Sequence, residues 1–255
     1  MIREYFGIRF EFDHQEFGRI IDERVKANEP GYVCAIDGTN FAIAMSDSRH
    51  LDVLRESIVN SCDSSWLPIM LNRIYGTHFS NYSGSDLFLD LVRKQQNRQF
   101  FLGSSRRVLE GLRKEMMKYD SNIGEMRFEE LPYCKAEEFD YEGIARMIND
   151  DAPDIIWVSL GAPKQEEFMR RLCPHLNKGV MVGIGAVFNF FSGLDDVPKR
   201  APKLMIKLHL EWLDRIFREP RKQIKRCALI LKVLPKVYSA EKKKRRSIQN
   251  KADVK

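Results

Sequence analysis

The sequence has no uninterrupted apolar run approaching the roughly 18 residues that a transmembrane helix requires. Its first 17 residues carry charges throughout and hold no apolar block of the kind found in signal peptides, so we expect a cytoplasmic protein. Cysteine is scarce and forms no CxxC pair, which argues against a zinc site or a disulfide framework. The five histidines share no ligand spacing, so we predict no metal site and no cofactor.

Three further patterns are missing. The glycines of GIGAVFNFFSG (Gly183, Gly185 and Gly193) do not follow the GxGxxG spacing of dinucleotide-binding proteins. The acidic residue that would bind a ribose is also missing, which disfavours a dehydrogenase. No base-stacking motif accompanies the basic residues, which disfavours a nucleic-acid partner.

The 255 residues are 44% apolar and 31% charged, enough for one large domain or for a domain with an appendage. The charge is distributed unevenly. Residues 200–255 hold 18 Lys and Arg against 5 Asp and Glu, whereas residues 1–199 hold 24 against 31. A mildly acidic body followed by a strongly basic tail predicts an anionic partner for the tail.

Short apolar runs followed by amphipathic helical patterns recur along the body. Strands with turns are expected at 31–40, 98–105, 154–163 and 179–193, and helices at 46–61, 87–96, 106–120, 137–152 and 164–176. Ser85 or Asp86 is expected to cap the helix that begins with Leu87. The pattern predicts an α/β fold with a Rossmann-like open, mainly parallel sheet flanked by helices. We expect a body at 1–199, a basic amphipathic helical appendage at 200–238 and a basic, disordered tail at 239–255.

Ligands of open parallel sheets bind at the carboxyl ends of the strands, which directs attention to AIDGTN, CDSSW, SLGAPKQE and GIGAVFN. Asp63 in CDSSW fits a general base and equally a helix cap. The cluster of Asp37, Thr39 and Asn40 is explained by default as an Asx turn. Gly161, Lys164 and Gln165 suit a phosphate or a sugar at a helix N-terminus, although an ordinary strand-to-helix turn explains them too.

The segment 203–238 differs in kind from the body. Leu, Ile and Trp recur at helical spacing in KLMIKLHLEWLDRIFREP, and basic residues accumulate after them. This pattern is typical of an interfacial helix that binds anionic lipid, and the alternative is a solvated helix packed on the body. The residues assigned to diphosphate or membrane binding are Arg200, Arg215, Arg218, Arg221, Lys222 and Lys225.

The blocks CDSSWLP, SGSDLF, FFLGSS, DIIWVSLGAPKQE, GIGAVFNFFSG and RAPKLMIKLHLEWLDRIFREP, taken together over residues 33–226, resemble the WecG/TagA/CpsF family of bacterial glycosyltransferases. The resemblance implies inverting transfer of a sugar of the N-acetylmannosamine type from a UDP-sugar to an acceptor on undecaprenyl diphosphate, for a surface polysaccharide. The transfer is expected to need no metal, which agrees with the lack of a DxD triplet here. It also implies peripheral association with the inner face of the plasma membrane.

The family's proposed catalytic aspartate falls on Asp63, which the resemblance makes the leading candidate for the base. Substrate binding is assigned to Thr39, Asn40, Ser85, Asp86, Gly161, Lys164, Gln165, Gly185 and Asn189. The chain departs from the family pattern at Gly38, where the family has threonine, and in CDSSW, where it has a PDGxG-like block. A membrane-docked nucleotide-binding regulatory or scaffold protein is the alternative of another class, and the sequence leaves open whether the chain forms a homo-oligomer.

Overall fold

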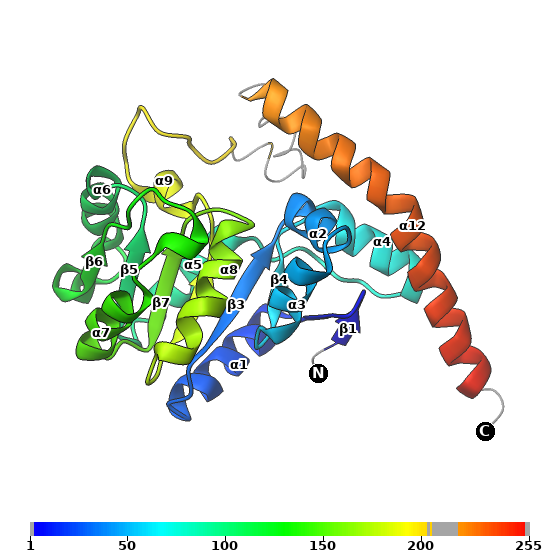
Figure 1. The fold of residues 1–255 in the computed structure, drawn as a ribbon, viewed down its shortest axis with the longest axis horizontal. Helices are drawn as coiled ribbons and strands as arrows, with labels where there is room; N and C mark the ends of the chain where they lie inside the picture. Colours follow the sequence, from blue (N-terminus) through cyan, green and yellow to red (C-terminus); the bar gives the residue numbers. More distant parts are fainter. Residues whose placement is uncertain (1–2, 203–204, 206–218, 253–255) are drawn as a thin grey trace.

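A computed structural model of the chain describes residues 3–202, 205 and 219–252 (Figure 1). Within these residues the strands form one eight-stranded sheet in the order β1-β2-β4-β3-β8-β7-β5-β6. The β1–β2 pair is antiparallel and the other neighbours are parallel. The strands are β1 (Arg3–Tyr5), β2 (Ile8–Phe10), β3 (Gly31–Ile36), β4 (Asn60–Cys62), β5 (Gln99–Gly103), β6 (Arg127–Glu129), β7 (Ile155–Ser159) and β8 (Val180–Gly183).

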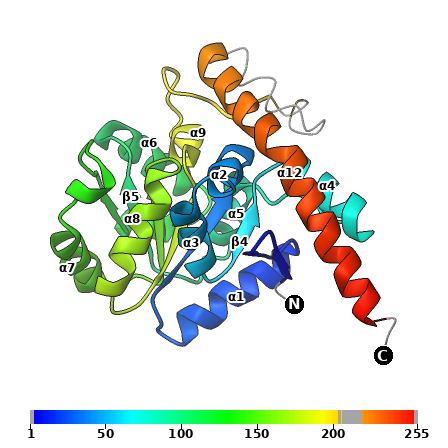
Figure 2. The same ribbon diagram turned by 45° about the vertical axis from the view of Figure 1, so that its right-hand side comes forward.

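Helices connect the strands and cover both faces of the sheet (Figures 1 and 2). The α-helices are α1 (His14–Lys26), α2 (Gly38–Ala44), α3 (Ser48–Glu56), α4 (Trp66–Tyr75), α5 (Gly84–Arg93), α6 (Arg106–Met116), α7 (Tyr141–Asp151), α8 (Lys164–Leu172), α9 (Val187–Phe191) and α12 (Pro220–Ala252). Short 3-10 helices are η1 (Ser121–Glu125), η2 (Ala136–Glu138) and η3 (Cys173–His175). The predicted α/β fold with an open, mainly parallel sheet is confirmed.

Alternate residues of each central strand enter two separate apolar layers, because successive side chains of a strand point to opposite faces. In β7, Ile156 and Val158 pack with Phe168 of α8, while Trp157 packs with Phe88 of α5 in the other layer. Burial on both faces explains why these strands read as continuous apolar runs.

The N-terminal hairpin was not predicted. Phe6 and Gly7 form its two-residue turn with φ of 57° and 76°, the left-handed backbone that such turns require. Strands of three residues are too short for alternation to indicate them.

Two local predictions were wrong. Helix α5 begins at Gly84 and is capped by Ser83, whose hydroxyl accepts from the Asp86 amide at 3.1 Å. Ser85 and Asp86 therefore lie in its first turn instead of capping it. Residues 187–191 form the short helix α9 instead of continuing a turn, because periodicity alone does not separate helix from strand in so short an apolar run.

The predicted disordered tail is also corrected, since α12 continues to Ala252. This helix packs against α2 and α4, at the end of the molecule opposite α6 and α7 (Figures 1 and 2). Glu241 accounts for the extension: it is only 3% exposed and accepts hydrogen bonds from the Tyr75 hydroxyl at 2.7 Å and the Phe6 amide at 3.3 Å. The tail is thereby fixed to α4 and to the N-terminal hairpin.

Helices α2, α4 and α12 meet at Gly38. A Cβ atom built on Gly38 would lie 2.5 Å from Nε1 of Trp66 and 3.2 Å from Cδ1 of Ile230. Only glycine allows these three helices so close an approach without displacement.

Of the predicted amphipathic segment 203–238, residues 203–204 and 206–218 lie outside the described residues, Arg215 and Arg218 included. In the part of the chain that the structure describes, no helix combines the length and the apolar character needed to cross a membrane.

Candidate functional site

The carboxyl ends of the parallel strands meet at one edge of the sheet. Cys34 of β3 and Val158 of β7 both pair with Gly183 of β8, and Ile36 of β3 pairs with Cys62 of β4. The turns that follow β3, β4, β7 and β8 therefore lie side by side. These are the four turns that the sequence singled out.

Asp63 follows β4 at this edge and is half-buried. Its amide donates to the Ile36 carbonyl at 2.9 Å, which fixes its backbone beside the end of β3. Oδ2 of Asp63 lies 3.7 Å from where a Cβ on Gly84 would be. Gly84 is the first residue of α5, so the carboxylate lies against the N-terminus of this helix.

A cation reaches the same helix end. Arg200 donates from Nη2 to Oδ1 of Asp86 at 2.9 Å, and the Ser83 hydroxyl donates to the other carboxylate oxygen at 2.6 Å. The side chain of Arg200 is 22% exposed and that of Asp86 46% exposed. Arg200 and Asp63 thus flank the first turn of α5, although 137 positions separate them in the sequence.

Gly161 and Gly185 border open space above the strand ends. Their φ angles are 80° and 58°, and no described atom lies within 4 Å of where a Cβ would be on either residue. Thr39 and Asn189 are half-buried in the neighbouring first turns of α2 and α9. These four residues remain candidates for contacting a ligand.

Two other predicted ligand contacts are turned inward. Asn40 and Gln165 are 1% and 2% exposed, and both amide groups are engaged in hydrogen bonds. Gln165 Oε1 accepts from the amides of Gly185 at 2.8 Å and Leu160 at 3.4 Å. Asn40 Nδ2 donates to Oε1 of Glu166 at 3.0 Å, and its Oδ1 contacts Nε2 of His50. These buried side chains connect the turns after β3, β7 and β8 to one another.

Lys164, the first residue of α8, is held by the segment that follows β6. Its ammonium donates to the Cys134 carbonyl at 3.1 Å and lies over the rings of Tyr133 and Phe139. The assignment of Lys164 to substrate binding stays a prediction. Ser85 is buried in α5.

Glu166 was missed by the sequence analysis. Its carboxylate is fully buried and accepts from Asn40 and, at 3.3 Å, from Nε2 of Gln165. Burial, with repulsion from Asp37, raises the pKa of Glu166 to about 7. Burial lowers the pKa of the His50 imidazole, which favours its neutral form. The only local indication that Glu166 is buried was its position three residues before Met169, which places both on one face of the helix.

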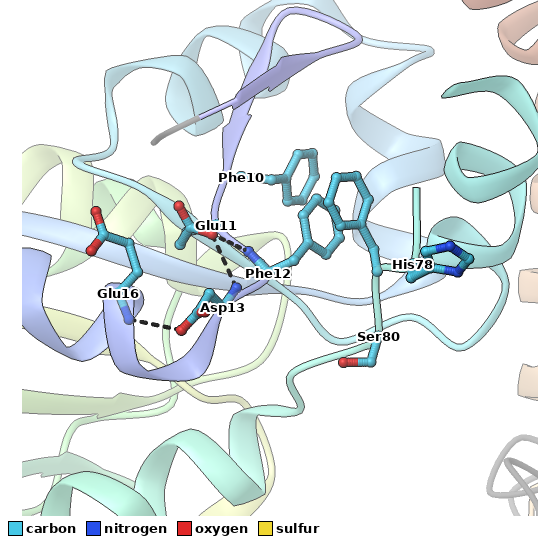
Figure 3. A pocket seen from close by; sticks show the side chains of 8 residues that line it. Phe10, Glu11, Phe12, Asp13, Glu16, His78 and Ser80 are labelled. Atoms are coloured by element: carbon cyan, nitrogen blue, oxygen red, sulfur yellow. Dashed lines mark hydrogen bonds between the residues drawn. The ribbon is translucent and has the colours of Figure 1, made fainter. Parts of the chain in front are cut away.

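A cavity of about 490 Å³ lies at the carboxyl end of β2, the strand next to β4 (Figure 3). Glu11 accepts there from the amides of Phe12 and Asp13, and Asp13 caps α1. The Phe12 ring stacks on that of Phe79 with centroids 4.2 Å apart. Its size suits a small molecule, and no pattern in the sequence indicated it. The lining residues are Phe10, Glu11, Phe12, Asp13, Glu16, His78, Phe79 and Ser80.

Of the predicted basic residues on α12, Arg221 and Lys225 are exposed, and the side chain of Lys222 lies outside what the structure describes. Among the described residues, no three His, Cys, Asp or Glu side chains gather as ligands for a metal ion.

Comparison with known proteins gives a consistent result. The sequence pattern of the glycosyl transferase WecG/TagA/CpsF family matches residues 3–247. An N-acetylglucosaminyldiphosphoundecaprenol N-acetyl-beta-D-mannosaminyltransferase of Bacillus subtilis strain 168 is 31% identical over 206 residues, which cover 79% of this chain and 77% of the relative. The protein of the same name from Bacillus spizizenii is 30% identical, with 69% and 67% covered. That from Staphylococcus aureus strain MW2 is 28% identical, with 62% and 59% covered.

Proposed function

The chain belongs to the WecG/TagA/CpsF family of glycosyl transferases, and from this premise we propose that it transfers an N-acetylmannosamine-type sugar from a UDP-sugar to a polyprenyl-diphosphate-linked acceptor. The product would enter the synthesis of a surface polysaccharide. The names of the Bacillus and Staphylococcus relatives support the sugar and the acceptor. The observation that carries the proposal is the position of Asp63 at the carboxyl edge of the sheet, beside the N-terminus of α5.

Asp63 acts as the general base. Its carboxylate takes the proton of the acceptor hydroxyl while that oxygen attacks the anomeric carbon from the face opposite UDP. The bond between the anomeric carbon and the diphosphate oxygen breaks, UDP leaves with the electron pair, and the configuration inverts.

Arg200 stabilises the departing diphosphate. Its guanidinium is held by Asp86 at the first turn of α5, where helix amide groups also favour negative charge. Guanidinium groups suit this task because they pair with phosphate oxygens through two parallel hydrogen bonds. Positive groups aimed at the developing charge lower the barrier to transfer.

Helix α12 binds the inner face of the plasma membrane, which carries the lipid-linked acceptor. Ile224 and Leu231 are 61% and 67% exposed and lie two helical turns apart, so they share one face. Arg221, Lys225 and Lys232 are exposed beside them. Apolar side chains flanked by basic ones are the arrangement that binds anionic lipid surfaces, with each basic residue contributing on the order of 1 kcal/mol.

A donor screen tests this function. The protein is mixed with each of several UDP-sugars and with N-acetylglucosamine on a polyprenyl diphosphate, and the product is weighed by mass spectrometry. We expect the acceptor to gain one N-acetylhexosamine from UDP-N-acetylmannosamine. Absence of product with every UDP-sugar would contradict the proposal.

A further inference from the structure

One buried carboxylate connects three of the turns at the carboxyl edge of the sheet. Oε1 of Glu166 accepts from Asn40, which belongs to the turn after β3, and from Gln165. Gln165 in turn accepts from Leu160 after β7 and from Gly185 after β8. Oε2 of Glu166 is buried and has no hydrogen-bond partner among the described residues.

The chemistry of these groups determines their orientation. An amide side chain has a donating end and an accepting end, whereas an ionised carboxylate only accepts. Ionised Glu166 therefore requires Asn40 to present Nδ2 to it and Oδ1 to His50. It likewise requires Gln165 to present Nε2, which leaves Oε1 for the Gly185 amide. A protonated Glu166 no longer imposes this arrangement, because a carboxylic acid can also donate.

We propose that Glu166 is a positioning residue, whose ionised carboxylate fixes the Asn40 and Gln165 amides and through them the turns that carry Thr39, Gly161 and Gly185. The inference rests on the proposed function for its effect on sugar transfer. Its structural part, control of the three turns, is independent of that function. Glu166 itself is buried beneath the turns and touches no substrate.

The protonation state of Glu166 changes in the neutral range. Burial is the main cause of its raised pKa of about 7, and the charge of Asp37 adds to it. The other titratable groups that face the network are the Cys34 thiol, whose pKa is raised by burial, and His50 beyond Asn40, whose pKa is lowered by burial. Both shifts favour the neutral form of the group. Hydrogen bonds to an ionised acceptor are roughly twice as strong as neutral ones, so the carboxylate orients the two amides most strongly when it is ionised. Ionising it in a buried position nevertheless lowers the stability of the fold as a whole.

The test compares the wild type with E166Q and E167Q between pH 6 and 8. Glu167 is the neighbouring carboxylate and pairs with Arg171 on the surface, so E167Q removes a similar charge outside the network. The first readout is the amide resonance of Gly185 in nitrogen-15 spectra. We expect it to shift with a midpoint near pH 7 in the wild type and in E167Q, and to stay constant in E166Q.

The second readout is the donor kcat/KM over the same range. We expect it to fall about tenfold from pH 8 to pH 6 in the wild type and in E167Q, as the ionised fraction of a group with pKa about 7 falls. E166Q should remain folded, with a low and pH-independent kcat/KM.

Each outcome is decisive. A Gly185 resonance that does not respond to pH, or that responds equally in E166Q, overturns the control of the turns. A shifting resonance with an unchanged activity profile in E166Q overturns the positioning role in catalysis. If no variant transfers sugar, the proposed function fails, and the resonance alone then decides whether Glu166 controls the turns.

Discussion

The hydroxyl of Tyr75 donates to the carboxylate of Glu241 at 2.7 Å and thereby fastens α12 to α4. Burial, together with the adjacent carboxylate, raises the pKa of Tyr75, so the hydroxyl remains a donor over the physiological range. The pair joins positions 166 residues apart and buries an acidic side chain within a basic helix.

We expect Y75F to lower the free energy of unfolding by about 1–3 kcal/mol, because a buried carboxylate loses a hydrogen-bond donor. Trypsin should also cleave the lysines of α12 faster. Chemical denaturation and timed proteolysis measure the two effects. Tyr133, whose side chain is fully exposed, provides the control Y133F, which should change neither. Equal stability of Y75F and wild type would show that this contact does not anchor the helix.

We expect D63N to lose at least about 100-fold in kcat, because an amide cannot take the acceptor proton. Its melting temperature should stay near that of the wild type, since Asp63 is only half-buried. The assay is formation of glycosylated lipid acceptor. D196N removes a carboxylate that forms an exposed ion pair with Arg107 and should keep full activity. Normal turnover by D63N would eliminate Asp63 as the base.

R200A separates a structural role of Arg200 from a role in binding diphosphate. If Arg200 stabilises the leaving group, R200A should lower kcat about 100–1000-fold, as loss of one donor to a developing negative charge does. D86A, which removes only its partner, should lower kcat much less. R107A is the control for loss of an exposed arginine. Equal losses in R200A and D86A would indicate that the ion pair serves the fold alone.

The exposed apolar side chains of α12 should determine membrane binding. I224D/L231D is expected to reduce co-sedimentation with phosphatidylglycerol vesicles at least tenfold, because each side chain would otherwise bury apolar surface in the lipid. Added salt should weaken the binding of the wild type, since exposed charges are screened over about 8 Å at physiological ionic strength. M117D alters an exposed apolar residue at the end of α6 and should bind normally. Unchanged sedimentation of the double variant would remove this surface from consideration.

Glu166 should make folding less stable as pH rises. Its folded pKa of about 7 lies above the ordinary value of 4.5, so its stabilising contribution is complete below pH 4.5 and is lost as the pH rises through 7. E166Q does not titrate there. The free energy of unfolding of E166Q, relative to the wild type, should therefore increase by up to about 3 kcal/mol from pH 4.5 to 8. Parallel denaturation curves at each pH measure this difference, and a constant difference would mean that Glu166 titrates normally.

The sequence was informative where local patterns determine structure. The apolar strands followed by amphipathic helices were sufficient to predict the α/β sheet, and the turn at Asp63 followed from the rule for strand ends. Glu166 was not predictable in the same way. An acidic residue in the first turn of a helix ordinarily faces solvent and favours the helix dipole, and Glu167 next to it does so.

The structure differs from the sequence-based predictions mainly where contacts join residues far apart in the chain. The Lys164 ammonium donates to the carbonyl of Cys134, 30 positions away. The Glu241 carboxylate of α12 accepts from the Tyr75 hydroxyl. Neither partner can be inferred from the composition of KQEEF or EKKKRRS. Arg200 was predicted to bind diphosphate or the membrane, and its contact with Asp86 was not predictable from the sequence.

The close approach of Trp66 and Ile230 to Gly38 limits which side chains residue 38 can carry. A threonine at residue 38 does not fit by itself, because its side chain would occupy the space of the Trp66 indole and of Ile230 in α12. A larger side chain at residue 38 therefore requires a different packing of α12 against α2 and α4. The substitution G38T would displace Trp66 and Ile230. A change in the turn after β3 would therefore alter the position of α12, the helix proposed to bind the membrane.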